Sequence, residues 1–233
     1  TAYHILVAST PELLEQGKGD IWDSGKIESD ASQWIAYQGK TLKRNAPYYW
    51  KVKIDTNKGA TNWSAPAFWT TGLFNEADWQ GQWIGLDRAA PGDSETQWSR
   101  LAARYLRKEF ALKKEVKRAT VHIAGMGLYE LFINGQRIGN QVLAPAPTDY
   151  RKTILYNTYD VTSLLQTENA IGVTLGNGRF YTMRQNYKPY KIPTFGYPKL
   201  RLNLIVEYAD GSKETIATNT TWKLTQGIDR CPL

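Results

Sequence analysis

The sequence predicts an all-β protein, and three observations support this fold class. Apolar and polar residues alternate in many short runs, which is the pattern of half-buried strands. Asn134-Gly135 and Asp210-Gly211 are hairpin signals between such runs. Only short segments have a helical pattern and no helical crossover links the strands, so an α/β nucleotide-binding fold is excluded. A β-sandwich or β-barrel is therefore expected.

The first region runs to about Gly72 and combines strands with one short helix. The predicted strands are residues 2–9, 48–55 and 65–72. Between the first two, Thr10 can cap a helix, Pro11 suits its first turn, and Gly17 ends it. Residues 73–82 have the composition of a connection between domains.

The second region has at least seven strand candidates. They are residues 104–112, 118–125, 128–134, 136–143, 170–176, 197–208 and 213–218. Asn134-Gly135 is the strongest turn signal, because both central residues of a type I′ turn need a positive φ. Residues 160–165 are predicted to form a single helical turn. The Asp160 or Thr162 side chain can accept hydrogen bonds from its first amide groups.

The composition excludes several classes of protein. Apolar residues make up 42% and charged residues 22%, with a formal net charge of +7, as in a soluble globular protein. Cys231 is the single cysteine, so neither an intramolecular disulfide nor a metal site of the zinc type is expected. No apolar run is long enough to span a membrane. The positive charge forms no concentrated stripe and no RNA-recognition motif occurs, so no nucleic-acid partner is expected.

No catalytic motif is recognised in the sequence. His4 and His122 each lie in an alternating strand, where a lone histidine is usually structural. The glycine motifs at 125–127 and 176–178 do not open a helix, so they are not phosphate-binding loops. A carboxylate pair for glycoside hydrolysis cannot be recognised from spacing, because its members meet only in the fold.

Polar and aromatic side chains gather in two predicted loops of the second region. Loops on a rigid β scaffold commonly carry binding groups. Aromatic rings stack on the apolar face of a sugar, while Asn, Asp and Arg bond its hydroxyls. Carbohydrate binding is therefore predicted for Asp149, Tyr150, Asn177, Arg179 and Tyr181, with Asn157, Phe180, Arg184 and Tyr187 in the same cluster. The alternative is a surface loop of ordinary composition.

Several segments resemble bacterial α-L-rhamnosidases. "AYHILVASTPELL", "IWDSGKIESDAS", "YYWKVKIDTNKGATNWS" and "FWTTGLF" resemble their N-terminal fibronectin-III-like module. "WIG", the run "LYELFING…VLAPAPTDYRK…YDVTSLL…ENAIGVTLGNG" and "TWKLT" resemble the β-sandwich domain that follows it. The resemblance implies two consecutive β-sandwich domains. Residues 1–75 would be a fibronectin-III-like sandwich lacking its first strands, and residues 79–233 a jelly-roll sandwich open at its C-terminal end.

The resemblance implies an accessory role, with no catalytic residue in this chain. In the family the catalytic carboxylates belong to a large α/α barrel further along the chain, and no residue here matches that motif. The implied partners are rhamnose-containing glycans and that barrel, and the implied location is periplasmic or extracellular. Some relatives of the second domain bind rhamnose with a calcium ion, but no calcium ligand can be matched residue by residue. Arg179 stands where family members often carry tryptophan, which weakens the expectation of an aromatic platform there.

Two functions from different classes stay open at this stage. The chain is either the glycan-contacting or scaffolding front of a rhamnosidase, or a stand-alone carbohydrate-binding or adhesion protein. A reading frame that continued beyond Leu233 into an α/α barrel would favour the first. Unpaired strand edges at the open ends are expected to promote self-association into a homo-oligomer.

Overall fold

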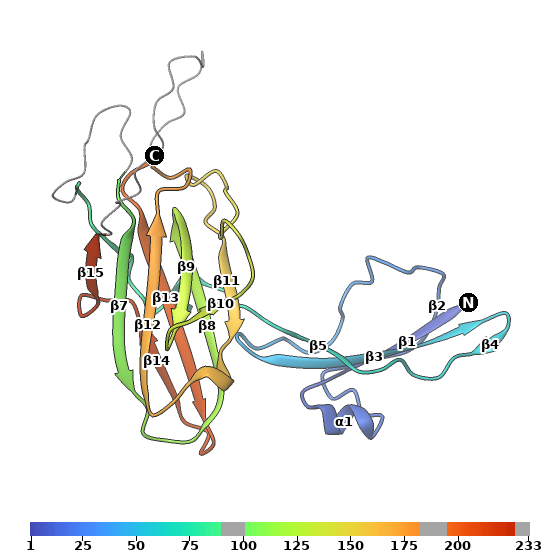
Figure 1. Cartoon of the computed structure of the whole chain (residues 1–233). Coiled ribbons are helices and arrows are strands. Elements are labelled where there is room, and N and C mark those ends of the chain that lie inside the picture. Colours follow the sequence, from blue (N-terminus) through green and yellow to red (C-terminus); the bar gives the residue numbers. More distant parts are fainter. Residues whose placement is uncertain (90–100, 182–194, 227–233) are drawn as a thin grey trace, which may run out of the picture. The chain divides into compact units, whose positions relative to one another are not determined.

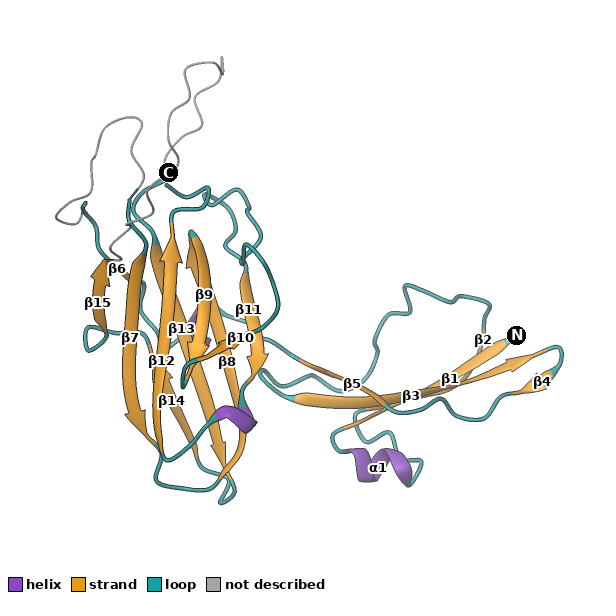
Figure 2. Ribbon diagram, viewed as in Figure 1, coloured by secondary structure: helices purple, strands orange, loops and turns teal. Residues whose placement is uncertain are grey.

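The structure is a computed structural model that describes residues 1–89, 101–181 and 195–226. The chain divides into two compact units, Thr1–Glu76 and Ala77–Leu233. The prediction of an all-β fold is confirmed, because both units are built from antiparallel strands (Figure 2). None of the helices among the described residues is long and apolar enough to cross a membrane.

The first unit carries one antiparallel sheet in the order β2-β1-β3-β4, with β5 also paired to β3 (Figure 1). Its strands are β1 Ala2–Ala8, β2 Trp22–Glu28, β3 Pro47–Thr56, β4 Gly59–Ala60 and β5 Ala67–Thr70. The three strands predicted from alternation are present as β1, β3 and β5. β2 was not predicted, because Gly25 and mostly exposed side chains hide its alternation.

One face of this sheet is covered by a loop. Ile5 and Val7 of β1 pack with Tyr48 of β3, and Ile35 and Leu42 of the connecting loop lie against them. This is the only sheet within residues 1–76, so the loop provides the cover that a second sheet gives in a complete sandwich.

The other face is covered by the predicted helix, which is confirmed as α1, Pro11–Glu15. Thr10 Oγ1 accepts a hydrogen bond from the Leu13 amide at 3.4 Å, as a capping residue should. Leu14 is fully buried and packs against Leu6 of β1. A single helical turn therefore closes this side of the sheet.

The second unit is a sandwich of two antiparallel sheets. One sheet has the order β10-β9-β12-β7-β15, and the other has the order β11-β8-β13-β14 with β6 paired to β13. The strands of the first sheet are β7 Arg104–Ala111, β9 Leu128–Ile133, β10 Gln136–Ile138, β12 Glu168–Gly176 and β15 Lys223–Gln226. Those of the second are β6 Ile84–Gly85, β8 Val116–Met126, β11 Tyr156–Asp160, β13 Lys199–Tyr208 and β14 Lys213–Ala217.

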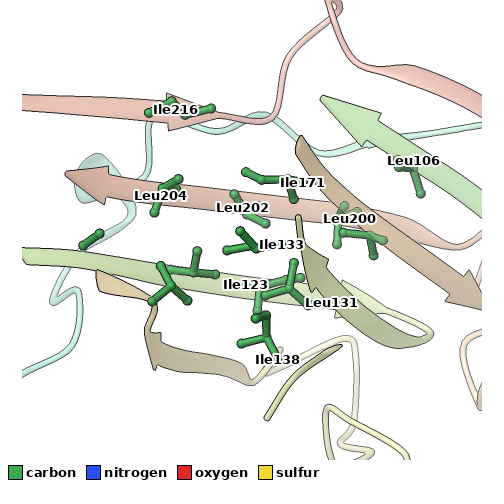
Figure 3. Close-up of a cluster of buried hydrophobic side chains, with 14 of the residues drawn as sticks. Leu106, Ile123, Leu131, Ile133, Ile138, Ile171, Leu200, Leu202, Leu204 and Ile216 are labelled. Atoms are coloured by element: carbon green, nitrogen blue, oxygen red, sulfur yellow. The ribbon is translucent and has the colours of Figure 1, made fainter. Parts of the chain in front are cut away.

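Alternate residues of both sheets form one hydrophobic core (Figure 3). Ile123, Leu202 and Leu204 of one sheet and Ile133 and Ile171 of the other are each 0% exposed. Burial of one such side chain stabilises a fold by about 1.5–3 kcal/mol relative to leaving it in water. This core fixes the two sheets and therefore the loops at their ends.

All seven predicted strands of the second unit are present, and the stronger hairpin signal is confirmed. Asn134 and Gly135 have φ angles of 51° and 80°, as a type I′ turn requires. β10 is shorter than predicted and ends at Ile138. The short strands β6, β11 and β15 were not predicted: β6 has only two residues, and polar residues interrupt the apolar pattern of β11 and β15.

The predicted helical turn at residues 160–165 is also confirmed. It is a 3-10 helix, η2, at Thr162–Leu164. Of the two candidates, Asp160 is the one whose side chain accepts from an early amide, because its Oδ1 lies 2.9 Å from the Thr162 nitrogen. The N-cap position itself is Val161, which has no side-chain cap.

Residues 77–82 pack on the second sheet of this unit. Asn203 of β13 accepts a hydrogen bond from the Gly81 amide at 2.8 Å and donates one to the Asp78 carbonyl at 3.1 Å. A Cβ atom on Gly81 would lie 2.5 Å from the Leu202 carbonyl oxygen. Only glycine therefore allows so close an approach to the strand.

His122 of β8 is buried under this segment. Its ring centroid lies 6.5 Å from that of Trp79 and 5.9 Å from that of Tyr156, and its Nδ1 lies 3.0 Å from Thr158 Oγ1. Burial, with a smaller contribution from the positive charge of Arg118, lowers the pKa of His122 to about 4. At neutral pH the imidazole is therefore an uncharged packing group.

Candidate functional site

The predicted sugar-contacting residues lie at one end of the second unit, called the loop end below. It comprises residues 144–155, 177–181 and 195–198. β12 ends there, and β11 and β13 begin there (Figure 1). The register explains this placement, because Gly176 lies opposite Leu128 and Lys199 lies opposite Met126, on either side of the β8–β9 turn. The two predicted loops therefore meet at the same end of the sandwich.

Close backbone contact between two glycine motifs holds the loop end together. Gly127 has a φ of 130°, and a Cβ atom there would lie 2.3 Å from the Gly176 carbonyl oxygen. Gly178 has a φ of 51°, and a Cβ atom there would lie 3.2 Å from the Gly127 carbonyl carbon. The glycines that the sequence analysis excluded as phosphate loops thus have a packing role.

Tyr150 is brought together with the segment that follows β12. Its ring centroid lies 5.2 Å from that of Phe180 and 5.3 Å from that of Phe195, in edge-to-face contacts. Burial raises the pKa of Tyr150, and the positive charge of Arg179 acts in the opposite direction. Tyr150 is half-buried and Arg179 is exposed, so a phenol and a guanidinium lie near each other at the surface.

Tyr181 and Asn177 are linked through the turn after β12. The Tyr181 amide donates to the Asn177 carbonyl at 3.2 Å. The Asn177 side chain donates to the Leu101 carbonyl at 2.8 Å, which ties the turn to the start of β7. The Tyr181 ring stacks on Tyr197, with centroids 5.8 Å apart. This pair forms a partly exposed aromatic surface.

Asp149 is exposed and bonds within its own loop. Its Oδ1 accepts from Arg151 Nε at 3.0 Å and from the Arg151 amide at 3.2 Å. The hydrogen bond from the Arg151 side chain is the main cause that lowers the pKa of Asp149. The carboxylate is therefore ionised at neutral pH, and both of its oxygens accept from the Arg151 side chain.

The remaining members of the predicted cluster are Asn157, Phe180, Arg184 and Tyr187. Asn157 lies in β11, opposite Ile123, and is half-buried. Phe180 is 7% exposed and belongs to the packing under the site rather than to its surface. Arg184 and Tyr187 lie outside the described residues.

Sequence reasoning missed Phe195 and Tyr197. Both precede β13, and the Phe195 amide donates to the Phe180 carbonyl at 2.9 Å. The sheet topology carried the signal for them. Both residues adjoin the start of β13, and the neighbouring strand β8 ends at the same end of the sandwich. Aromatic residues at that point could have been added to the cluster.

The arrangement suits hydrogen bonding to hydroxyl groups and stacking against an apolar ring face. A carboxylate, a guanidinium, a carboxamide and two phenols surround partly exposed rings. Calcium needs six to eight oxygen ligands, and the described loop end offers the Asp149 carboxylate already ion-paired with Arg151. No group of three or more His, Cys, Asp or Glu suited to a metal occurs in the described part of the chain. The described residues do not by themselves fit a calcium ion.

Comparison with known families gives a match for each unit. Residues 114–230 match the family described as the α-L-rhamnosidase N-terminal domain. Residues 1–75 match the family described as the Rha78A-like N-terminal immunoglobulin domain. The two matches fall on either side of the boundary between the two units.

Curated proteins and solved structures agree with these matches. The chain is 38% identical to an α-L-rhamnosidase of Formosa agariphila, over 97% of the chain and 26% of that protein. It is similar to the structure of α-L-rhamnosidase from Dictyoglumus thermophilum, with a TM-score of 0.85, 40% identity, and coverage of 97% of this chain and 26% of that one. For native α-L-rhamnosidase from Aspergillus terreus the TM-score is 0.83 with 31% identity, covering 97% of this chain and 25% of that one. The chain thus spans about a quarter of the length of the relatives it matches.

Proposed function

Because the chain belongs to the α-L-rhamnosidase N-terminal domain family, we propose that it is the non-catalytic front region of an α-L-rhamnosidase. The observation that carries this proposal is the pair of family matches, which together fall on both units. Hydrolysis of terminal α-L-rhamnosides would belong to an α/α-barrel domain of the whole protein, which is the partner of this region. The two β units would hold that domain and contact the glycan.

The glycan contact is placed at the loop end. Tyr181 on Tyr197 provides the stacking surface, and Asp149, Tyr150 and Arg179 surround it with donors and acceptors. Asn177 acts through its bond to Leu101, which positions the turn. Hydrogen bonds to sugar hydroxyls compete with water, so each contributes only about 0.5–1.5 kcal/mol net, or somewhat more where the protein group is charged. Binding of a single sugar is therefore expected to be weak.

The proposal also covers the ligands of the protein and its location. Rhamnose-containing glycans are the proposed ligands, and the periplasm or the extracellular space is the proposed location. No cofactor is proposed, because the described loop end does not fit a calcium ion. Self-association is proposed for the exposed strand edges.

The first test is an activity assay on the purified chain with an aryl α-L-rhamnoside. No turnover is expected, because hydrolysis needs an acid and a second carboxylate on either side of the bond. Turnover that follows the chain through purification and persists in independent preparations would contradict a non-catalytic role.

The second test is an NMR titration with L-rhamnose, with and without calcium. Shifts are expected at the loop end, and Tyr181→Ala should weaken binding about fivefold because it removes the stacking ring. Tyr105→Ala is the matched control, since Tyr105 is 44% exposed on β7 and lies outside the loop end. Equal loss in both variants, or shifts confined to the first unit, would refute the proposed contact site.

A further inference from the structure

Trp34 has the most exposed large apolar side chain among the described residues, at 97% of its full area. It lies in the loop between β2 and β3 and has a φ of 61°. Large side chains rarely adopt this left-handed backbone, because the Cβ atom crowds the backbone there. A strained backbone that presents an indole ring to water is unfavourable for folding, so it suggests a role in binding.

The loop that carries Trp34 is attached to the sheet at both of its ends. The Ser29 amide donates to the Thr1 carbonyl at 3.1 Å, and the Lys40 amide donates to the Ile21 carbonyl at 2.9 Å. Gly39 lies so close to β2 that a Cβ atom there would be 2.5 Å from Trp22 Cβ. Both ends of the loop are therefore fixed to the sheet of the first unit.

A cavity of about 440 Å³ lies between this loop and β2. This is within the range of about 300–1,000 Å³ that is usual for small-ligand sites. Its lining includes three aromatic side chains and three polar ones: Tyr3, Trp22, Trp34, Asp23, Ser24 and Gln38. Such a mixture matches the two kinds of surface on a sugar ring.

Two of the lining groups are held in place by neighbours. The Trp22 ring meets Tyr37 edge to face at 5.3 Å, and the Tyr37 hydroxyl donates to the Lys40 carbonyl at 2.6 Å. Asp23 Oδ1 accepts from the Gly25 amide at 2.9 Å and lies 2.6 Å from His4 Nε2. The bond from the Gly25 amide is the largest cause that lowers the pKa of Asp23, so its exposed carboxylate is an ionised acceptor.

We propose that this cavity binds a pyranose ring of a neutral glycan, with Trp34 stacking on the ring and Asp23, Ser24 and Gln38 bonding its hydroxyls. Asp23 is the single charged residue in the lining, which disfavours anionic sugars. A protein partner fits less well, because the centre of a protein interface is depleted of charged residues and the Asp23 side chain is 54% exposed beside the cavity. The site is separate from the loop end of the second unit.

The test is a titration of the intact chain with methyl α-L-rhamnopyranoside, methyl α-D-galactopyranoside and methyl β-D-glucopyranoside, each to high millimolar concentration. At least one is expected to shift the indole N–H signal of Trp34 in NMR spectra. Trp34→Ala should weaken this binding about tenfold, and Trp34→Phe should retain part of it, because a smaller ring still stacks. Both variants are expected to fold, since the side chain makes few contacts.

Phe68→Ala is the matched control, because Phe68 is an aromatic side chain of the same unit, 69% exposed, on β5 and outside the cavity lining. It should leave binding unchanged. The proposal is overturned if none of the three glycosides shifts Trp34, or if Trp34→Ala binds as the parent does. It is also overturned if sedimentation shows that Trp34→Ala converts a dimer into a monomer without affecting sugar binding, which would assign the surface to a second copy of the chain.

Discussion

The two units reach very different degrees of burial from similar strand patterns. In the second unit, alternate residues of two sheets face each other, and Ile123 and Leu202 are 0% exposed. In the first unit, one sheet is covered by a loop and a short helix, and Ile27 and Ile54 remain 39% and 43% exposed. Alternation therefore predicts that a strand has an apolar face, but a second layer decides how much of that face is removed from water.

The largest effect should come from truncating the core of the second unit. Leu202→Ala is expected to cost about 2–5 kcal/mol of unfolding free energy, because it leaves a cavity between two sheets. Ile54→Ala in the first unit should cost about 1 kcal/mol or less, since much of that side chain is already in water. Urea unfolding, followed by signals assigned to each unit, measures both values. Similar losses of unfolding free energy in the two variants would contradict the proposed difference between the two units.

A second difference is that the second unit contains a buried histidine, which makes its stability depend on pH. The folded pKa of His122 is about 4, and the unfolded pKa is about 6.5. Above pH 6.5 both states are neutral and stability is complete. As the pH falls towards 4, the unfolded state binds a proton that the folded state does not, and about 3 kcal/mol is lost.

The control for this prediction is His122→Gln, whose stability should fall less over the same pH range. Carboxylates also titrate in this range, so the difference between parent and variant is the quantity to compare. Thermal melting from neutral to acidic pH is sufficient. Parallel curves for the two proteins would show that His122 does not contribute.

A smaller effect should distinguish two glycines within the second unit. Gly81→Ala is expected to cost about 1–3 kcal/mol, because the new methyl group would meet the backbone of β13 and displace residues 77–82. Gly172→Ala should be neutral or stabilising by up to about 1 kcal/mol, since its Cβ atom would have an ordinary contact with Phe132 at 3.9 Å. Equal losses of stability in the two variants would mean that the close approach of Gly81 to the backbone of β13 is not what fixes residues 77–82.

Much of the fold could be predicted because its signals are local. The cap at Thr10 and the turn at Asn134-Gly135 are encoded by neighbouring residues, and both are present. β2 was missed because most of its side chains are exposed, so it has little apolar pattern to read. β11 was missed for a related reason: it has several polar side chains, and its Thr158 lies opposite the polar His122 of β8.

The candidate site was predictable only in part, because its members meet through sheet register. Tyr150 and Phe180 are thirty positions apart, yet the sequence analysis placed both in one cluster, and their rings touch. Phe195 and Tyr197 were overlooked because they lie fourteen and sixteen positions after Tyr181 in the sequence. The role of Asn177 as a tether to Leu101 could not be read from sequence, since nothing local distinguishes a structural carboxamide from a binding one.

The contact between Gly127 and Gly176 has a consequence for engineering. It is a contact between backbone atoms, so this part of the frame beneath the loop end does not depend on the exposed side chains of the loops. The exposed residues Ala146, Pro147, Arg151 and Lys152 could then be randomised for display libraries, while both glycines, the buried Ala144 and the packed Tyr150 are kept. The second unit would serve as a scaffold whose recognition surface is exchanged and whose supporting turn stays constant.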